Sequence, residues 1–222
     1  MAEAPRHRDM QGRPPPLEGL WETTAAVSRV FAWLGGLLLL LAAILVSAEV
    51  VSRKLLTMVY SGSDEMAAYL FAVGTTWSLA HVLVTRGHVR IDALYLHLPA
   101  RTRAALDLVA LLALGIVTAA MLDRSFDLVL SNYLEWNRSN TPLRTPLSLP
   151  QMPWVFGLAL FLFSICVAFL RASIALARGD LLAVSRTAGV AAQDEEIESE
   201  LASLGIATGK HPAPTTDSTG KR

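Results

Sequence analysis

The chain has 222 residues, and its 19 Lys and Arg residues balance its 19 Asp and Glu residues, which excludes a strongly basic domain that binds nucleic acid. Its mean hydropathy is +0.43, and its few charged residues gather toward the two ends of the chain. A water-soluble domain would spread charges along every surface helix. The composition therefore predicts an integral membrane protein. One cysteine, Cys166, excludes an intramolecular disulfide and a metal site with several thiolates.

Four stretches are long and apolar enough to cross a bilayer, which takes about 20 residues of helix. Three of them are nearly free of charge and lie at residues 30–51, 66–85 and 152–170. The sequence therefore predicts an all-α membrane protein with four transmembrane helices and a membrane domain over residues 30–170.

The third span is interrupted by charge. Only residues 108–122 lack formal charges, and as a helix they would cover only about 22 Å. We expect a span over about 104–128, inside a helix that starts near Thr102 and continues toward Tyr133. A re-entrant or interfacial helix is the alternative.

Arginines determine the predicted orientation. They are more numerous beside the two termini and in the loop between the second and third spans than in the other two loops. Because basic residues stay in the cytoplasm, the predicted topology is N-in and C-in. Residues 1–29 then form a cytoplasmic tail with a possible amphipathic lead-in on the membrane surface, and residues 171–222 form a largely disordered cytoplasmic tail.

Little in the chain suggests catalysis. It has no HExxH metal motif and no Walker-type glycine loop. Only His81 lies within a predicted span, so the second axial histidine that a haem between helices commonly needs is missing. The prediction is a protein that is not an enzyme and that carries no cofactor of its own. His81 and the polar residues at 75–78 form a band that must find hydrogen bonds inside protein.

Charged residues flank the first loop. Glu49 and Arg53 have the i, i+4 spacing that allows an ion pair on one helix face. Asp64 and Glu65 follow Ser63, which predicts an N-cap at Ser63 with two acids at the positive end of the helix. Capping accounts for these residues, and a contact with a partner subunit remains open.

The second loop begins with a turn signal. Gly87 permits a sharp turn at the end of the second span. Around it, a hydrogen-bonded junction is predicted for Arg86, His88, Arg90 and Asp92.

The third loop is rich in proline. It runs from Trp136 to Pro153 and contains Pro142, Pro146 and Pro150. These prolines predict a stiff, extended segment that ends where Pro153 enters the first turn of the last helix. The loop is either a docking surface or a rigid connection that places the last span.

Small residues recur at four-residue spacing in each predicted span, which is typical of helices that pack closely in lipid. The pairs are Ala43 and Ser47, Gly74 and Ser78, Gly115 and Ala119, and Ser164 and Ala168. The abundance of Ala and Gly in membrane helices is the alternative explanation.

Three of these motifs occur together in one family. Asp64-Glu65 at the head of the second span, Arg86-Gly-His-Val-Arg-Ile-Asp92 after it, and Thr141-Pro142 with Pro146 and Pro150 stand in that order. With them, residues 30–170 resemble the small membrane subunit (DctQ-like) of tripartite ATP-independent periplasmic (TRAP) transporters. Met66 stands where that family often has a second glutamate.

The resemblance implies a multi-pass protein of the bacterial inner membrane. A soluble periplasmic protein would capture the substrate, usually an organic acid, and a large DctM-like subunit would hold the ion sites, normally for sodium. The small subunit would contact lipid and act as a static scaffold that binds no substrate. The Arg86–Asp92 segment would lock its cytoplasmic end, and the third loop would face the receptor or the large subunit.

Two other functions fit the same spans. One is a membrane-anchor subunit of an oxidoreductase, similar to a cytochrome b. The other is an assembly scaffold without a role in transport.

Overall fold

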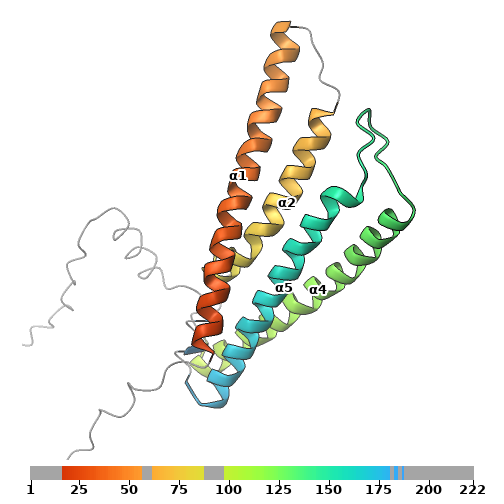
Figure 1. Ribbon diagram of the computed structural model, residues 1–222. Coiled ribbons are helices and arrows are strands. Elements are labelled where there is room, and N and C mark those ends of the chain that lie inside the picture. The colour runs from red at the N-terminus through yellow and green to blue at the C-terminus, as the bar shows by residue number, and fades with distance from the viewer. Residues whose placement is uncertain (1–16, 57–61, 88–97, 181–182, 185–186, 188–222) are drawn as a thin grey trace, which may run out of the picture. The chain divides into compact units, whose positions relative to one another are not determined.

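The computed structural model describes residues 17–56, 62–87, 98–180, 183, 184 and 187. These residues form an all-α fold of four long helices (Figure 1): α1 (Glu18–Leu56), α2 (Ser63–Val84), α4 (Ala100–Leu134) and α5 (Ser148–Ala177). Each helix is long and apolar enough to cross a membrane. The prediction of four apolar helices is thus confirmed, while the N-in, C-in topology stays a prediction.

The helices extend beyond the charge-free stretches. The predicted helix from near Thr102 toward Tyr133 is confirmed, because α4 runs from Ala100 to Leu134. With 39 residues, α1 is about 58 Å long, well beyond the roughly 30 Å of a bilayer core. Residues 18–29 are the first turns of α1, and the amphipathic lead-in on the membrane surface stays a prediction. Polar residues at the end of a helix cost little free energy, so the length of a charge-free stretch underestimates the length of the helix.

Figure 1 shows α2 between α1 and α5, while α4 lies against α5. Buried residues of α2, α4 and α5 form one apolar core, which includes Leu83, Leu111, Phe161 and Ile165. The two outer helices bury much less: only 11% of the most apolar window of α1 and 17% of that of α4 are buried. Long apolar faces of α1 and α4 are therefore left for lipid or for another protein.

Glycines bring the helices into close contact at two places. A Cβ atom on Gly35 would lie 2.6 Å from the carbonyl oxygen of Gly74 and 2.6 Å from the hydroxyl oxygen of Ser78. A Cβ atom on Gly157 would lie 2.6 Å from Oγ1 of Thr76 and 2.8 Å from Cδ1 of Trp77. Thus α2 packs closely against both α1 and α5.

The predicted small-residue pairs divide accordingly. Gly74 and Ser78 lie at the contact with α1, which confirms a packing role for that pair. Ser164 and Ala168 are buried in α5. Ala43 and Ser47, by contrast, are exposed on α1, and Ala119 is exposed on α4.

Two predicted helix starts are corrected by the structure. The N-cap of α2 is Gly62, with φ 112°, and Ser63 is the first helical residue, so the predicted Ser63 cap is wrong. Asp64 and Glu65 nevertheless lie in the first turn, as expected. The last helix already begins at Ser148, which places Pro150 in its first turn and Pro153 inside the helix.

The end of α2 has a different turn from the one predicted. The amide of Gly87 donates to the carbonyl of Val82 at 2.9 Å, and the amide of Arg86 donates to that of Leu83 at 3.1 Å. This pair of bonds defines a Schellman motif. The left-handed position belongs to Arg86, with φ 59°, and not to Gly87. Gly87 therefore closes the turn through its amide, while Arg86 takes the left-handed conformation.

Trp77 joins three helices. Its indole N–H donates to the carbonyl oxygen of Pro153 at 2.8 Å, and its ring meets that of Phe31 edge-on at 5.0 Å.

Trp77→Phe removes the hydrogen bond, and we expect the free energy of unfolding to fall by about 1 kcal/mol. Unfolding of the purified chain in detergent by added SDS measures this change. Trp136→Phe is the control, since Trp136 is 74% exposed; equal losses in both variants would contradict the prediction.

Candidate functional site

Two of the predicted motifs meet at the carboxylate of Glu65. Its oxygens accept hydrogen bonds from the hydroxyl of Tyr69 at 2.6 Å and from the hydroxyl of Thr141, which lies 76 residues further along the chain. The hydroxyl of Ser139 lies 2.7 Å from that of Thr141. Glu65 is 9% exposed. We call Glu65, Tyr69, Ser139 and Thr141 the outer cluster; it fixes the third loop to the start of α2.

The third loop folds back on itself, which corrects the prediction of an extended segment. Arg138 and Pro146 form an isolated antiparallel bridge. The amide of Ser139 donates to the carbonyl of Thr145 at 2.9 Å, and that of Leu147 donates to the carbonyl of Asn137 at 3.1 Å. Hence residues 137–147 are a closed turn, in which proline limits the conformations while backbone bonds fix the shape.

Amides at the base of this turn connect it to both neighbouring helices. Asn137 donates to the side-chain oxygen of Asn132 at 3.1 Å, and Asn132 donates to that of Gln151 at 2.9 Å. Asn132 is itself buried. This chain of amide groups links the end of α4 to the start of α5.

The tip of the turn lies over the start of α2. A Cβ atom on Gly62 would meet the side chain of Leu143, and the left-handed φ of 112° favours glycine at this cap. Pro142, Leu143 and Arg144 are exposed at the tip, and Trp136 is exposed at its base. These residues form a polar and apolar surface held in place by the outer cluster.

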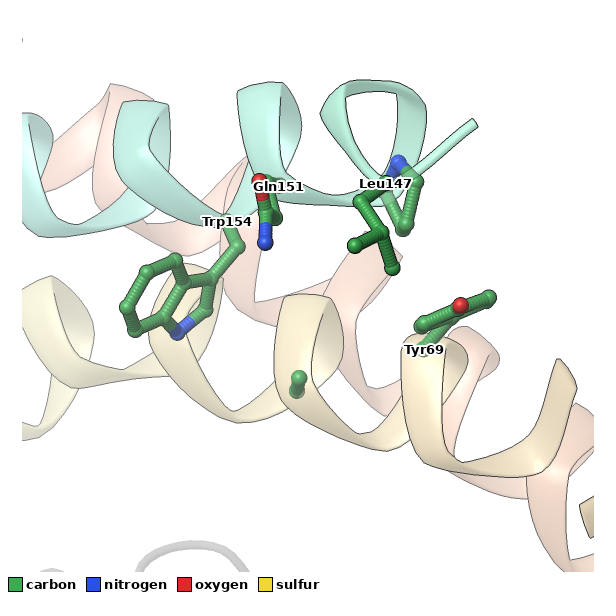
Figure 2. Close-up of a pocket in the computed structure, with 6 residues that line it drawn as sticks. Tyr69, Leu147, Gln151 and Trp154 are labelled. Atoms are coloured by element: carbon green, nitrogen blue, oxygen red, sulfur yellow. The ribbon is translucent and has the colours of Figure 1, made fainter. Parts of the chain in front are cut away.

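A small cavity of about 80 Å³ lies beside the outer cluster, between α2 and α5. Figure 2 shows Gln151 and Trp154 extending from α5 toward α2, with Tyr69 opposite Leu147. The ring of Tyr69 faces this cavity, while its hydroxyl binds Glu65. The cavity thus lies between α2 and α5 at the level of the outer cluster.

The predicted pair at the end of α1 is present. Arg53 binds Glu49 across one helical turn. Glu49 is 5% exposed, while the side chain of Arg53 is 56% exposed. The pair therefore places a buried carboxylate against a cation that reaches outward, which stabilises this end of the helix.

The predicted junction after α2 is only partly described. Arg86 and Gly87 form the Schellman turn, whereas His88, Arg90 and Asp92 lie outside the described residues. His81 is half-buried, and its Nδ1 atom is buried with no hydrogen-bond partner among the residues that the structure describes. The structure thus describes the turn that begins this junction, and the contacts predicted for His88, Arg90 and Asp92 stay a prediction.

One contact between α5 and the beginning of α1 was not predicted. The guanidinium of Arg171 lies 5.0 Å from the ring centroid of Trp21, within the range of a cation–π interaction. Thr24 and Ser28 are buried on the same part of α1. Arg171 follows the last charge-free stretch and was assigned to the cytoplasmic tail, so the charge pattern hid its position inside α5.

The chain was compared with known families and proteins. The family model of the DctQ component of tripartite ATP-independent periplasmic transporters matches residues 42–175, which is more than half of the chain. The chain belongs to the DctQ family. No curated protein and no solved structure matches it. This DctQ protein is a component of a TRAP transporter and not an enzyme.

The match covers the features described above. Glu49, the outer cluster and the Schellman turn all lie within the region that the DctQ model matches. The family implies two further components, a DctM-type membrane subunit and a periplasmic binding protein. In the described part of this DctQ chain, there is no group of three or more His, Cys, Asp and Glu residues that could hold a metal ion.

Proposed function

We propose that this DctQ protein is the static scaffold of its transporter in the bacterial inner membrane, with both termini in the cytoplasm. It braces the large subunit during ion-coupled uptake of an organic acid, which the periplasmic protein delivers. Sodium is the expected coupling ion, and its sites belong to the large subunit. Membership of the DctQ family is the observation that carries this proposal.

Helix packing supports a static role. The contacts of Gly35 with Gly74 and of Gly157 with Thr76 hold α2 against both neighbours at close range. Rearranging such contacts would require the helices to separate, because close-packed groups do not deform continuously. A rigid frame is what a moving subunit needs beside it.

The exposed helices support a large partner. α1 and α4 expose apolar side chains along their length, among them Leu37, Ile44, Val109 and Ile116. Lipid can cover such faces, and so can the helices of a larger subunit. We propose that the large subunit covers part of them and that the tip of the third loop, at Pro142, Leu143 and Arg144, faces the receptor or the outer rim of the large subunit.

Co-purification tests the proposal. The tagged chain is extracted from native membranes in detergent, and the proteins that accompany it are identified by mass spectrometry. A large polytopic subunit is the expected result. Recovery with a redox enzyme and haem absorbance would favour an anchor subunit of an oxidoreductase, and recovery of the chain alone would favour an assembly scaffold. Either result would overturn the proposal.

Arg90 offers a sharper test of the cytoplasmic end. We expect Arg90→Gln to lower recovery of the large subunit severalfold, because the variant loses a cation from the predicted junction, while the affinity of the soluble receptor for its substrate stays the same. Arg178→Gln is the matched control, since Arg178 is exposed just after α5. Full recovery with Arg90→Gln would exclude the role of Arg90 in assembly.

A further inference from the structure

A groove of about 510 Å³ runs along an exposed face of α1 and does not include the outer cluster. It is lined by Arg29, Ala32, Trp33, Gly36, Leu37 and Leu40 of α1 and by His81 of α2. The lining residues of α1 cover 12 positions, or about 17 Å of helix. That length is about the depth of one leaflet of the roughly 30 Å bilayer core.

The floor and walls of the groove are apolar. Gly36 has no atom within 4 Å of the position where a Cβ atom would stand, so the floor there is open. Trp33, Leu37 and Leu40 are 79%, 52% and 57% exposed. An apolar chain in the groove would therefore cover side chains that no other part of the described structure covers.

Polar groups gather at one end of the groove. Arg29 is exposed, and it has no ion-pair partner among the residues that the structure describes. His81 faces the groove with its Nδ1 atom buried and unpaired within the described structure. An imidazole carries at least one ring N–H, which can donate a hydrogen bond to a phosphate oxygen. One cation and one imidazole thus lie beside an apolar strip.

We propose that this groove binds one anionic phospholipid. The phosphate lies at Arg29 and His81, and an acyl chain follows Trp33, Gly36 and Leu40. The arrangement of polar and apolar groups along the groove favours a lipid, because a lipid also has one charged end and one apolar end. A transmembrane helix of a partner would be apolar along the whole strip and would have to supply a counter-ion opposite Arg29.

Fluorescence quenching tests the site on the full chain. The chain is reconstituted in phosphatidylcholine vesicles that contain a minor fraction of brominated phosphatidylglycerol or, for comparison, of brominated phosphatidylcholine. The quenching that Trp33→Phe removes is the part due to Trp33. We expect the anionic lipid to bind near Trp33 about fivefold more strongly than the zwitterionic lipid, the preference that one basic side chain confers.

Variants decide what causes the preference. Arg29→Gln should abolish it, and Arg178→Gln, at an exposed arginine outside the groove, should keep it. High salt should weaken it in the wild-type chain, because screening reduces attraction between exposed charges. Equal quenching by the two lipids, or a preference that survives Arg29→Gln, would overturn the proposal.

The assembled transporter gives a second test. If the co-purified complex retains the quenching of Trp33 by the anionic lipid, the site is open to lipid in the working protein. Loss of this quenching on assembly would show that a partner helix covers the groove, and the lipid site would be wrong. The vesicle experiment on the chain alone does not depend on co-purification, so failure of the lipid site leaves the scaffold proposal standing.

Discussion

Replacing Gly35 with alanine should force α1 away from α2, whereas the same change at Gly36 should leave the two helices packed. The added methyl carbon of Gly35→Ala would lie 2.6 Å from the carbonyl oxygen of Gly74, which is backbone and cannot rotate aside. Overpacking of this kind costs about 1–3 kcal/mol. We expect that loss in the free energy of unfolding, measured by SDS titration of the purified chain with helicity as the signal.

Gly36→Ala is a closely matched control. It makes the same chemical change one residue away, on the same helix, where nothing lies within 4 Å of the new atom. Both variants gain the same helix propensity from the loss of glycine, so the difference between them isolates the contact with α2. Equal stability of the two variants would refute the close contact of α1 with α2.

Gly35 and Gly36 also show where sequence reasoning stops. Both lie in the same charge-free stretch, and nothing local distinguishes them, yet one meets a neighbouring helix and the other faces outward. Absence of charge predicted that four helices exist, because lipid demands apolar residues over a fixed length. Which face of each helix packs depends on its rotation in the bundle, and composition does not contain that information. Gly74 and Ser78 were identified because their spacing alone indicated a packing face.

The third loop shows the same limit at a turn. Its prolines correctly excluded a helix between α4 and α5, but they did not predict that the segment closes on itself. Closure depends on pairs such as Ser139 with Thr145, whose backbone groups meet only after the chain reverses direction. Likewise, Arg86 occupies the left-handed position that the sequence assigned to Gly87, because the helix ends one residue earlier than glycine alone suggests.

The outer cluster was predicted as separate motifs and not as a contact. Glu65 was explained by capping, and Thr141 was noted for its place in a family pattern. The structure makes one the acceptor of the other's hydroxyl across 76 residues. A favourable interaction with the helix dipole and this contact are compatible, since a carboxylate in the first turn of a helix is favourable for its charge and its oxygens can still accept hydrogen bonds.

A double-mutant cycle between Glu65 and Thr141 should show strong coupling. Thr141→Val removes the hydroxyl, and Glu65→Gln removes the charge while keeping the shape. Because hydrogen bonds to a charged group are stronger than those between neutral groups, each single variant should lower the melting temperature of the chain in detergent by a few degrees. In the double variant the loss should be clearly smaller than the sum of the two, since Glu65→Gln weakens the same bond that Thr141→Val removes.

Asp64→Asn is the control for charge at this helix end. Asp64 adjoins Glu65 in the first turn of α2 but is exposed, so its neutralisation tests the helix dipole without touching Thr141. We expect little change in melting temperature from Asp64→Asn. If Glu65→Gln had no larger effect, or if the losses at Glu65 and Thr141 simply added, the carboxylate would act only at the helix end. The third loop would then be held by its own backbone bonds, and its tip would not depend on α2 for its position.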